Sequence, residues 1–133
     1  MTILNKKSGL LGVTGVSNDM RDVEAAADEG NERCKLALAM FARRVKGYIG
    51  NYMAQLNGAD AVVFTAGIGE NDDWMRGEIC KNMEALGIEF DEEKNANREL
   101  VFSKDSSKVK LLRIPTDEEM VIAKDTARLV SGK

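Results

Sequence analysis

The sequence predicts an α/β fold in which a few parallel strands are flanked by helices. Two short apolar segments, 61–65 and 109–114, have the composition of buried strands. Roughly 45 residues of mostly helical pattern separate them, which is enough for the crossover that joins two parallel strands. Helical patterns also precede the first strand and follow the second. Two clear strands are fewer than a free-standing doubly wound domain normally has, so the predicted sheet is small.

The segment before the first strand contains the longest predicted helix. Residues 1–17 are interrupted by three glycines and predict a structured loop. Residues 19–28 predict a short helix, with acidic residues early and Gly30 past its end. Residues 31–57 carry apolar residues at the helical period. This stripe consists of Cys34, Leu38, Phe41, Val45, Tyr48, Tyr52 and Leu56. The helix would be roughly 40 Å long, so we expect part of it to face a partner subunit or a part of the protein outside this chain.

The remaining elements follow a glycine-rich turn at 66–71. A second amphipathic helix is expected over 72–85, with Gly87 as its stop. Its apolar side consists of Trp74, Ile79, Met83 and Leu86. There follow in chain order a short helix at 91–97, a short edge strand at 99–103, a polar turn at 104–107, the second main strand, which ends at Pro115, and a last helix at 117–129.

Composition and charge exclude several classes of function. The chain has 133 residues, enough for one domain with a hydrophobic core. Its net charge of −3 is evenly spread, whereas nucleic-acid binders usually carry a basic face, so we expect no nucleic-acid partner. Histidine is absent, which excludes Ser-His-Asp triads, acid–base chemistry by histidine and most zinc sites.

The cysteines and the apolar segments indicate the compartment. Cys34 and Cys80 lie in helical segments without CxxC spacing and indicate small buried residues of a reduced, cytoplasmic protein. A disulfide or a metal pair is the alternative. The first seven residues are too short and too polar for a signal peptide, and no apolar stretch approaches membrane-spanning length. We therefore expect no membrane partner.

The glycine-rich turn within Val62–Asn71 is the most informative feature of the chain. A β-branched apolar run ends at Gly67 and Gly69, where backbone amides and a helix N-terminus can hold phosphate without a cationic side chain. The turn is not a Rossmann fingerprint, because Asp72 stands where the third glycine belongs, and no GxxxxGK[ST] loop occurs. Nucleotide contact and a plain tight turn followed by an acidic helix cap remain alternatives.

A second group of polar residues, at 115–119, follows the second strand. Thr116 and Glu119 have the spacing of a capping box, and Asp117 is ordinary first-turn charge. Glu118 is not needed for the cap, so its carboxylate can reach out from the strand end toward a magnesium ion held partly by water and by nucleotide phosphates. From the residues alone, the acidity of a helix start is the simpler interpretation.

A third group lies at Ser17–Arg21. Arg21 falls in the first turn of a helix, where a positive charge is unfavourable for the helix dipole, so a specific role is plausible. A guanidinium group can stack on a base or pair with a phosphate. The alternative is an ordinary solvated arginine.

Taken together, the three segments resemble acetate kinases. Val63–Asn71 strongly resembles the nucleotide-binding signature of this family, and Ser17–Arg21 resembles its serine–x–aspartate–hydrophobic–arginine adenosine loop. Ile114–Ala123 resembles its C-terminal metal-binding segment. The segments occur in the family's order and at fitting separations. The resemblance therefore covers essentially the whole chain, 1–133, as a C-terminal nucleotide-binding segment that is an incomplete domain.

The resemblance implies a fold and a set of site residues. The fold is part of the C-terminal domain of an actin-like ATPase (ribonuclease H-like), as in sugar kinases and heat-shock ATPases. The metal ligand implied for Mg²⁺ is Glu118. The residues implied to bind ATP or ADP are Asp19, Met20 and Arg21, beside the adenine and ribose, and Gly67, Ile68, Gly69, Glu70 and Asn71, around the nucleotide with their amides near its phosphates.

The resemblance also implies an activity and an assembly. Acetate kinases transfer phosphate between ATP and acetate, which forms acetyl phosphate, and they are homodimers joined through the C-terminal half. A homodimer would give the long helix at 31–57 an outward partner. Two alternatives remain: a non-catalytic binding or dimerisation module, and a segment of a propionate or butyrate kinase.

The resemblance is limited to roughly the C-terminal third of an acetate kinase. The family's acyl-phosphate site, its catalytic arginines and aspartate, its histidines and its main phosphate-binding loop lie upstream and have no counterpart here. We therefore expect no catalytic residue in this segment. Because phosphoryl transfer depends almost entirely on positioning and charge neutralisation, we expect little or no activity from this chain alone.

Overall fold

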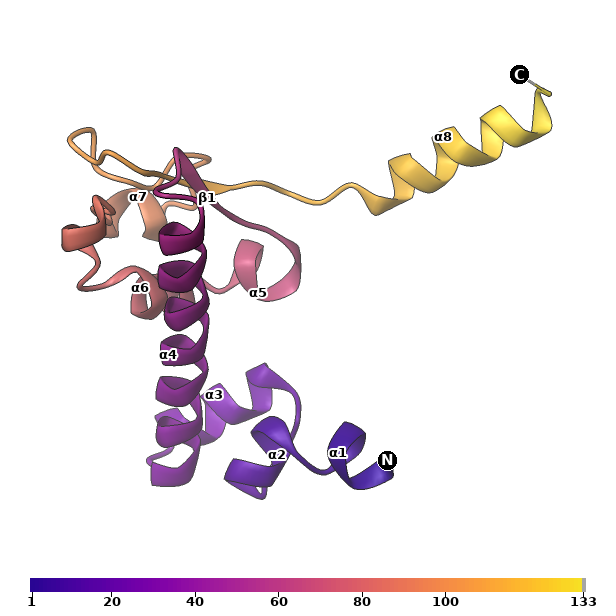
Figure 1. Cartoon of the computed structure of the whole chain (residues 1–133). Helices are drawn as coiled ribbons and strands as arrows, with labels where there is room; N and C mark the ends of the chain where they lie inside the picture. Colours follow the sequence, from indigo (N-terminus) through magenta and orange to yellow (C-terminus); the bar gives the residue numbers. More distant parts are fainter. Residues whose placement is uncertain (133) are drawn as a thin grey trace.

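The computed structural model describes residues 1–132, in which short helices surround one long helix and a pair of strands (Figure 1). In chain order the elements are α1 (Thr2–Lys6), α2 (Gly9–Thr14), α3 (Met20–Asp28), α4 (Glu32–Gln55), β1 (Ala61–Phe64), α5 (Ala66–Asn71), α6 (Asp73–Cys80), the 3-10 helix η1 (Glu84–Leu86), α7 (Glu92–Ala96), β2 (Lys110–Arg113) and α8 (Glu118–Val130). This order confirms the predicted α/β class.

The two strands form a small parallel sheet. Ala61 pairs with Lys110 at one end of the sheet, and Phe64 pairs with Arg113 at the other. Both strands lie inside the segments predicted for them, and their parallel pairing confirms the predicted crossover connection. The carboxyl ends of β1 and β2 therefore lie side by side, which determines where the segments that follow them begin.

The prediction of an edge strand at 99–103 is wrong. Val101 forms a single antiparallel bridge with Leu112 of β2, and Ser103 forms another with Phe90. Because the segment changes its pairing partner within two residues, no ladder extends along it. Phe102, between the two bridges, is fully buried.

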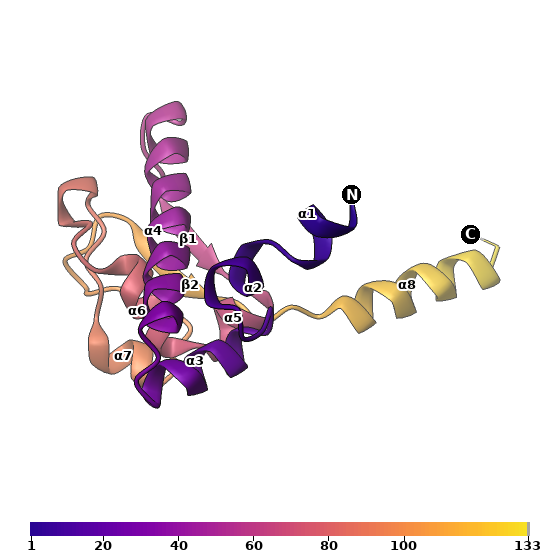
Figure 2. The same ribbon diagram turned by 90° about the horizontal axis from the view of Figure 1, so that it is seen from below.

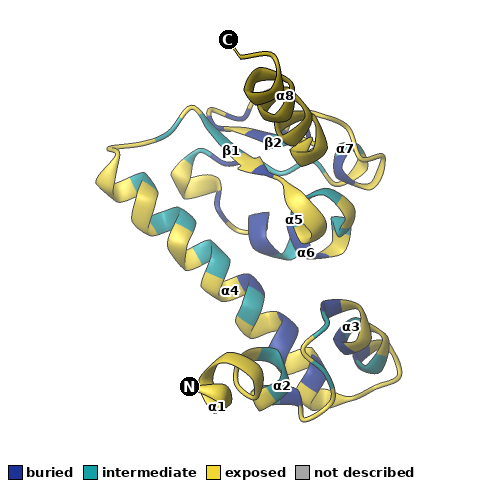
Figure 3. Ribbon diagram, turned by 90° about the vertical axis from the view of Figure 1, so that its right-hand side faces the viewer, coloured by how far each residue is buried: buried dark blue, intermediate teal, exposed yellow. Residues whose placement is uncertain are grey.

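Helix α4 connects the two halves of the molecule (Figure 3). Its N-cap is Asn31, whose side-chain oxygen accepts hydrogen bonds from the backbone amides of Arg33 and Cys34. Its N-terminal half packs against α2 and α3, and α6 packs beside it. The predicted stripe is buried at Cys34 and Leu38. Its far end, at Tyr48, Tyr52 and Leu56, is exposed, which agrees with an outward-facing part of this helix.

The hydrophobic core joins the sheet to the helices around it. The ring of Phe102 meets the ring of Phe64 edge to face, with 5.5 Å between the centroids, and a similar contact joins it to Phe90. Cys34 and Cys80 are both buried and free, as predicted from their positions in helices. Burial raises the pKa of the Cys80 thiol to about 12, so this cysteine is an inert core residue.

The prediction of a loop over residues 1–17 is wrong, because this segment forms α1 and α2. Its glycines lie at helix ends as well as inside a helix. Gly15 adopts a left-handed conformation with φ of 72° and ends α2, and its amide donates to the Leu11 carbonyl. Gly9 and Gly12 lie within α2. The spacing of the glycines thus marks short helices, not the absence of helix.

The helix predicted over 72–85 is shorter than expected. It ends at Cys80, because Lys81 leaves the helical conformation and Asn82 has a positive φ of 56°. The 3-10 helix η1 follows, and Gly87, the predicted stop, is its C-cap. The predicted apolar side is only half correct: Ile79 and Met83 are buried, whereas Trp74 and Leu86 are exposed.

Helix α8 extends away from the rest of the molecule at the end of an extended segment (Figures 1 and 2). None of its residues is buried. Its exposed apolar side chains are Met120, Val121, Ile122, Leu129 and Val130. The predicted short helix at 91–97 and the polar turn at 104–107 are both confirmed. No helix within residues 1–132 has the length and apolar character needed to cross a membrane.

Candidate functional site

The candidate site lies at the carboxyl edge of the sheet. The amide of Ile114 donates to the carbonyl of Phe64 over 2.9 Å, so the chain leaves both strands at the same place. The segment 65–71 begins there after β1, and the segment 114–119 begins there after β2. In open α/β sheets, ligands bind outside the carboxyl ends of the strands, so this edge is where a ligand is expected.

The glycine-rich segment forms a short helix, α5, and not the bare turn that the sequence predicts. The turn is made by Ala66, which has a positive φ of 60°, and both glycines lie inside the helix. A Cβ atom on Gly69 would lie 3.1 Å from the carbonyl carbon of Phe64, so this glycine allows α5 to pack on β1. A Cβ atom on Gly67 would meet nothing within 4 Å, so packing does not explain the glycine there.

The carboxylate of Glu70 joins the two segments at the sheet edge. Its Oε1 accepts hydrogen bonds from the amide of Ala66 over 2.7 Å and from both the amide and the hydroxyl of Thr116 over 2.8 Å. The bonds from Thr116 lower the pKa of Glu70. The structure therefore brings the predicted nucleotide segment and the predicted metal segment into direct contact.

The predicted capping box is wrong. The hydroxyl of Thr116 is bonded to Glu70, and the residue that caps α8 is Asp117, whose Oδ1 accepts from the amide of Met120 over 2.9 Å. An aspartate is as good a helix cap as a threonine, so local sequence could not decide between them. Glu118 and Glu119 are both exposed in the first turn of α8.

The polar residues after the glycines have local roles. The side-chain amide of Asn71 donates to the carbonyl of Gly67 over 3.0 Å within α5. Asp72 caps α6, because its Oδ1 accepts from the amide of Met75 over 2.7 Å. The alternative of an acidic helix cap is therefore correct for Asp72, and it is compatible with nucleotide contact by the residues before it.

The third predicted segment begins α3. Asp19 is the N-cap, and its carboxylate accepts from the amide of Arg21 and from two nitrogens of the Arg21 guanidinium, at 3.0 and 2.6 Å. These bonds lower the pKa of Asp19 to about 2. Asp19 therefore offsets the unfavourable position of Arg21 in the first turn. Arg21 is exposed, whereas Met20 is buried in the core at 8% exposure.

A pair of carboxyl groups connects α3 with the segment after α5. The carboxylate of Asp72 acts on that of Glu24, and each of the two side chains has one buried oxygen with no hydrogen-bond partner among residues 1–132. Burial and the neighbouring Asp72 raise the pKa of Glu24 to about 7. Both residues line an open cavity of about 550 Å³. All three predicted segments are thus linked to α5 or to the residue that follows it.

The predicted metal ligand, Glu118, does not belong to a cluster of potential metal ligands among residues 1–132. Among residues 1–132, no group of three acidic or cysteine side chains is arranged to hold a metal ion. Magnesium commonly takes one or two carboxylates and completes its shell with water and substrate phosphates. An exposed carboxylate at the carboxyl edge of the sheet fits one position in such a shell, and the other donors would come from the nucleotide and water.

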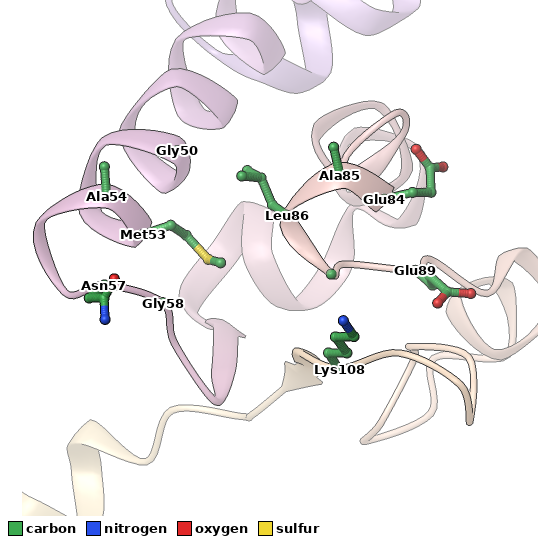
Figure 4. Close-up of a pocket in the computed structure, with 11 residues that line it drawn as sticks. Gly50, Met53, Ala54, Asn57, Gly58, Glu84, Ala85, Leu86, Glu89 and Lys108 are labelled. Carbon is green, nitrogen blue, oxygen red and sulfur yellow. The ribbon is translucent and has the colours of Figure 1, made fainter.

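A different pocket lies at the opposite edge of the sheet (Figure 4). It has a volume of about 450 Å³ and is lined by residues that precede the strands, including Gly58 and Lys108, together with the end of α4 and η1. Met53 and Leu86 face each other across it. Because it lies at the amino ends of the strands, it is not part of the candidate site.

Three arginines near α5 are not predicted from the sequence as site residues. Arg76 donates to the carbonyl of Gly69 over 3.0 Å, and Arg98 donates to the carbonyl of Asn71 over 3.2 Å. Arg113 in turn donates to the carbonyl of Arg98 over 2.9 Å. One signal was present in the sequence: Arg76 lies between Met75 and Gly77, on the side of its helix that carries core residues.

Comparison with known proteins identifies the family of the chain. The family model described as the acetokinase family matches residues 1–124. Acetate kinase 2 of Clostridium perfringens is 54% identical over 132 residues, which are 98% of this chain and 33% of that protein. The chain therefore spans about a third of the length of the curated relatives that it matches.

Solved structures agree with the sequence comparison. The crystal structure of Porphyromonas gingivalis acetate kinase superposes with a TM-score of 0.89 at 46% identity and covers 97% of this chain and 33% of its own. A propionate kinase from Francisella tularensis superposes with a TM-score of 0.84 at 42% identity, over 92% of this chain and 31% of its own. The fold therefore matches the predicted partial kinase domain.

Proposed function

The chain belongs to the acetokinase family, and on this basis we propose that it forms the nucleotide-binding C-terminal part of a kinase that transfers phosphate between ATP and acetate. The observation that carries the proposal is the contact made by Glu70. Its carboxylate joins the segment after β1 to the segment after β2, so the two signature segments form one site at the carboxyl edge of the sheet.

We assign the nucleotide contacts to two groups of residues. The first group borders the adenine and ribose. It consists of the exposed Arg21, which Asp19 orients, and the backbone at the buried Met20. In α5, open space around Gly67 leaves its backbone accessible to the phosphates. The α5 residues in this assignment are Gly67, Ile68, Gly69, Glu70 and Asn71. Since the carboxylate of Glu70 is engaged with Thr116, its role is to hold the site together.

We assign magnesium to Glu118. Its carboxylate supplies one ligand, and bound Mg²⁺ neutralises charge on the nucleotide phosphates. Glu118→Gln is expected to weaken Mg-ADP binding and to leave binding of metal-free ADP unchanged, as measured by calorimetry. Glu119→Gln is the matched control, because Glu119 is the next exposed carboxylate of the same helix. Equal effects of the two substitutions would contradict the assignment.

The acyl side of the reaction belongs to the other two thirds of the relatives' length. The chain contains no histidine and covers about a third of each acetate kinase that it matches. We therefore expect no measurable turnover with acetyl phosphate and Mg-ADP in a coupled assay of this chain alone. A normal acetate kinase turnover from the chain alone would contradict this division of the site.

A propionate or butyrate kinase remains the alternative for the acyl group. The similarity to the Francisella tularensis propionate kinase shows that this part of the fold is shared between enzymes with different acyl substrates. Residues of the carboxyl sheet edge contact the nucleotide in our assignment, so they do not select the acyl chain. Activity assays of the parent protein with acetate, propionate and butyrate distinguish the candidates.

The exposed end of α4 supports a homodimer and keeps a non-catalytic dimerisation module as the second candidate. Tyr48, Tyr52 and Leu56 are 49, 58 and 68% exposed, which is unusual for three large apolar side chains on one helix. Sedimentation should show a dimer that Tyr52→Glu dissociates. A dimer that does not respond to Mg-ADP in any assay would favour the non-catalytic module.

We also propose a cytoplasmic location. Cys34 and Cys80 are both free and buried, which suits a compartment that keeps thiols reduced. The relatives named above are kinases of small molecules. The charge distribution of the chain does not suggest a nucleic-acid or membrane partner. Fractionation of the source cells with an antibody to the chain tests the location.

A further inference from the structure

The guanidinium of Arg76 is buried in the interior of the molecule. Arg76 belongs to α6 and is only 1% exposed. Among residues 1–132 it forms no salt bridge with a carboxylate. Burial lowers the pKa of Arg76; the negative charge of Asp73 opposes this shift, and the positive charges of Arg113 and Arg98 add to it. Burying a charge without an ion-pair partner is costly, so we expect the buried guanidinium of Arg76 to have a specific role.

The contacts of Arg76 join three helices. Its Nε donates to the side-chain oxygen of Asn95 over 2.8 Å, and its Nη2 donates to the Asn95 carbonyl over 3.3 Å. Asn95 lies in α7, is 4% exposed and donates to the carbonyl of Asp73 over 2.7 Å. The guanidinium also lies over the ring of Phe102, 5.5 Å from its centroid. One side of the planar group is therefore fixed.

The free side of the guanidinium holds α5. Its Nη1 donates to the carbonyl of Gly69 over 3.0 Å. This carbonyl lies in the last turn of α5, where carbonyl groups have no partner within the helix and where a positive charge is favourable. On its other side, Gly69 packs so closely on Phe64 that a Cβ atom would lie 3.1 Å from the Phe64 carbonyl carbon. The short helix is thus held between β1 and Arg76.

We propose that Arg76 is a positioning residue for nucleotide binding, because it fixes the orientation in which α5 presents residues 67–71 at the sheet edge. The inference rests on the proposed function of these residues. Lysine cannot replace arginine in this role, since its single ammonium group cannot hold Asn95 and Gly69 at the same time as a planar fork does. Arg76 itself does not touch the nucleotide.

The experiment compares two substitutions with a control in the same helix. Arg76→Lys keeps the buried charge, and Arg76→Met keeps similar volume without charge. Ile79→Val is the control, because Ile79 is a buried core residue one turn along α6 and its shortening lowers stability without touching Gly69. The measurements are hydrogen exchange of the α5 amides, the Kd for Mg-ADP, and the thermal midpoint of the 133-residue chain.

Both Arg76 variants are expected to raise hydrogen exchange in α5 and to weaken Mg-ADP binding by on the order of tenfold, the loss expected for a hydrogen bond to a charged group. Ile79→Val should lower the thermal midpoint and leave both other measurements unchanged. Because Arg76→Lys preserves charge, it decides the question if Arg76→Met does not fold. Addition of guanidinium ion to Arg76→Ala should restore protection of α5.

The proposal is overturned if Arg76→Lys leaves exchange in α5 and the Kd unchanged, or if Ile79→Val changes them as much as the arginine variants do. A wild-type chain that does not bind Mg-ADP at millimolar concentration contradicts the proposed nucleotide site instead. In that case the hydrogen-exchange comparison still decides whether Arg76 orients α5.

Discussion

At the scale of single residues, Glu70 connects parts of the chain that lie 46 positions apart. Three hydrogen bonds converge on one oxygen of its carboxylate, one from α5 itself and two from Thr116. A charged acceptor with several donors makes stronger bonds than a neutral one. The ionised state of Glu70 therefore holds the two strand-end segments together.

Glu70→Gln is expected to lower stability at neutral pH and to have a smaller effect in acid. The pKa of Glu70 is lowered from 4.5 in the folded protein, so its contribution is present above the unfolded pKa and is lost as pH falls through the folded pKa. Urea midpoints of wild type and variant should differ at pH 7 and converge in acid. Glu119→Gln, an exposed neighbour on α8, should show no such trend. A difference that does not depend on pH would mean that the charge of Glu70 is unimportant.

Glu24 should produce the opposite dependence on pH. Its pKa is raised from 4.5 to about 7 in the folded state, mainly by burial and by Asp72, so the folded protein binds this proton more tightly than the unfolded chain. The stability that this provides is complete below about 4.5 and is lost as pH rises to about 7. The negative charges of Asp28 and Asp19, at the two ends of α3, add to the raised pKa of Glu24.

The corresponding test is Glu24→Gln, because a glutamine amide donates to Asp72 at every pH. The variant should match wild type near pH 4.5 and exceed it in thermal midpoint at pH 8. Glu29→Gln is the control, since Glu29 is exposed at the end of the same helix. If Glu24→Gln lowers stability at pH 8, the carboxyl pair is not a site of repulsion and the account of Glu24 is wrong.

At the scale of elements, the glycines of α5 have different roles. Gly69→Ala places a Cβ atom 3.1 Å from the backbone of Phe64 and should cost about 1–3 kcal/mol, the range for overpacking. Gly67→Ala meets open space and, because alanine favours helix, should leave stability unchanged or slightly higher. Denaturant unfolding measures both. Equal losses would show that α5 does not pack on β1 as described.

Several elements could be predicted from the sequence because local signals agreed. The apolar period from Cys34 onward and the apolar runs that form β1 and β2 each reflect a simple pattern of burial. Where the chain crosses from β1 to β2, the parallel pairing follows from the length of the connection.

The features that could not be predicted depend on contacts between distant residues. Thr116 has the sequence of a cap, but Glu70 competes for its hydroxyl, so Asp117 becomes the cap. Ala66, and not the adjacent Gly67, adopts the positive φ of the turn, whereas Gly69 packs on β1. The burial of Arg76 depends on Asn95, which is 19 residues away. Sequence patterns do not contain these pairings.

At the scale of the whole molecule, we propose that the chain forms one wall of a nucleotide site. Exposed apolar side chains lie on the C-terminal end of α4, and others lie on helix α8, which extends away from the rest of the molecule (Figures 2 and 3). The matched kinases are about three times as long. The carboxyl edge of the sheet, with α5 on it, is nevertheless built by contacts within this chain.

The measurement that tests the central claim most directly is the mapping of Mg-ADP on the ¹⁵N-labelled chain by NMR. We expect shifts at residues 19–21, 66–71 and 114–118, around the carboxyl edge of the sheet, and no shifts around Met53 and Lys108 in the pocket at the amino edge. No response at millimolar Mg-ADP, or shifts confined to the amino-edge pocket, would contradict the claim that this chain carries the nucleotide wall of the kinase.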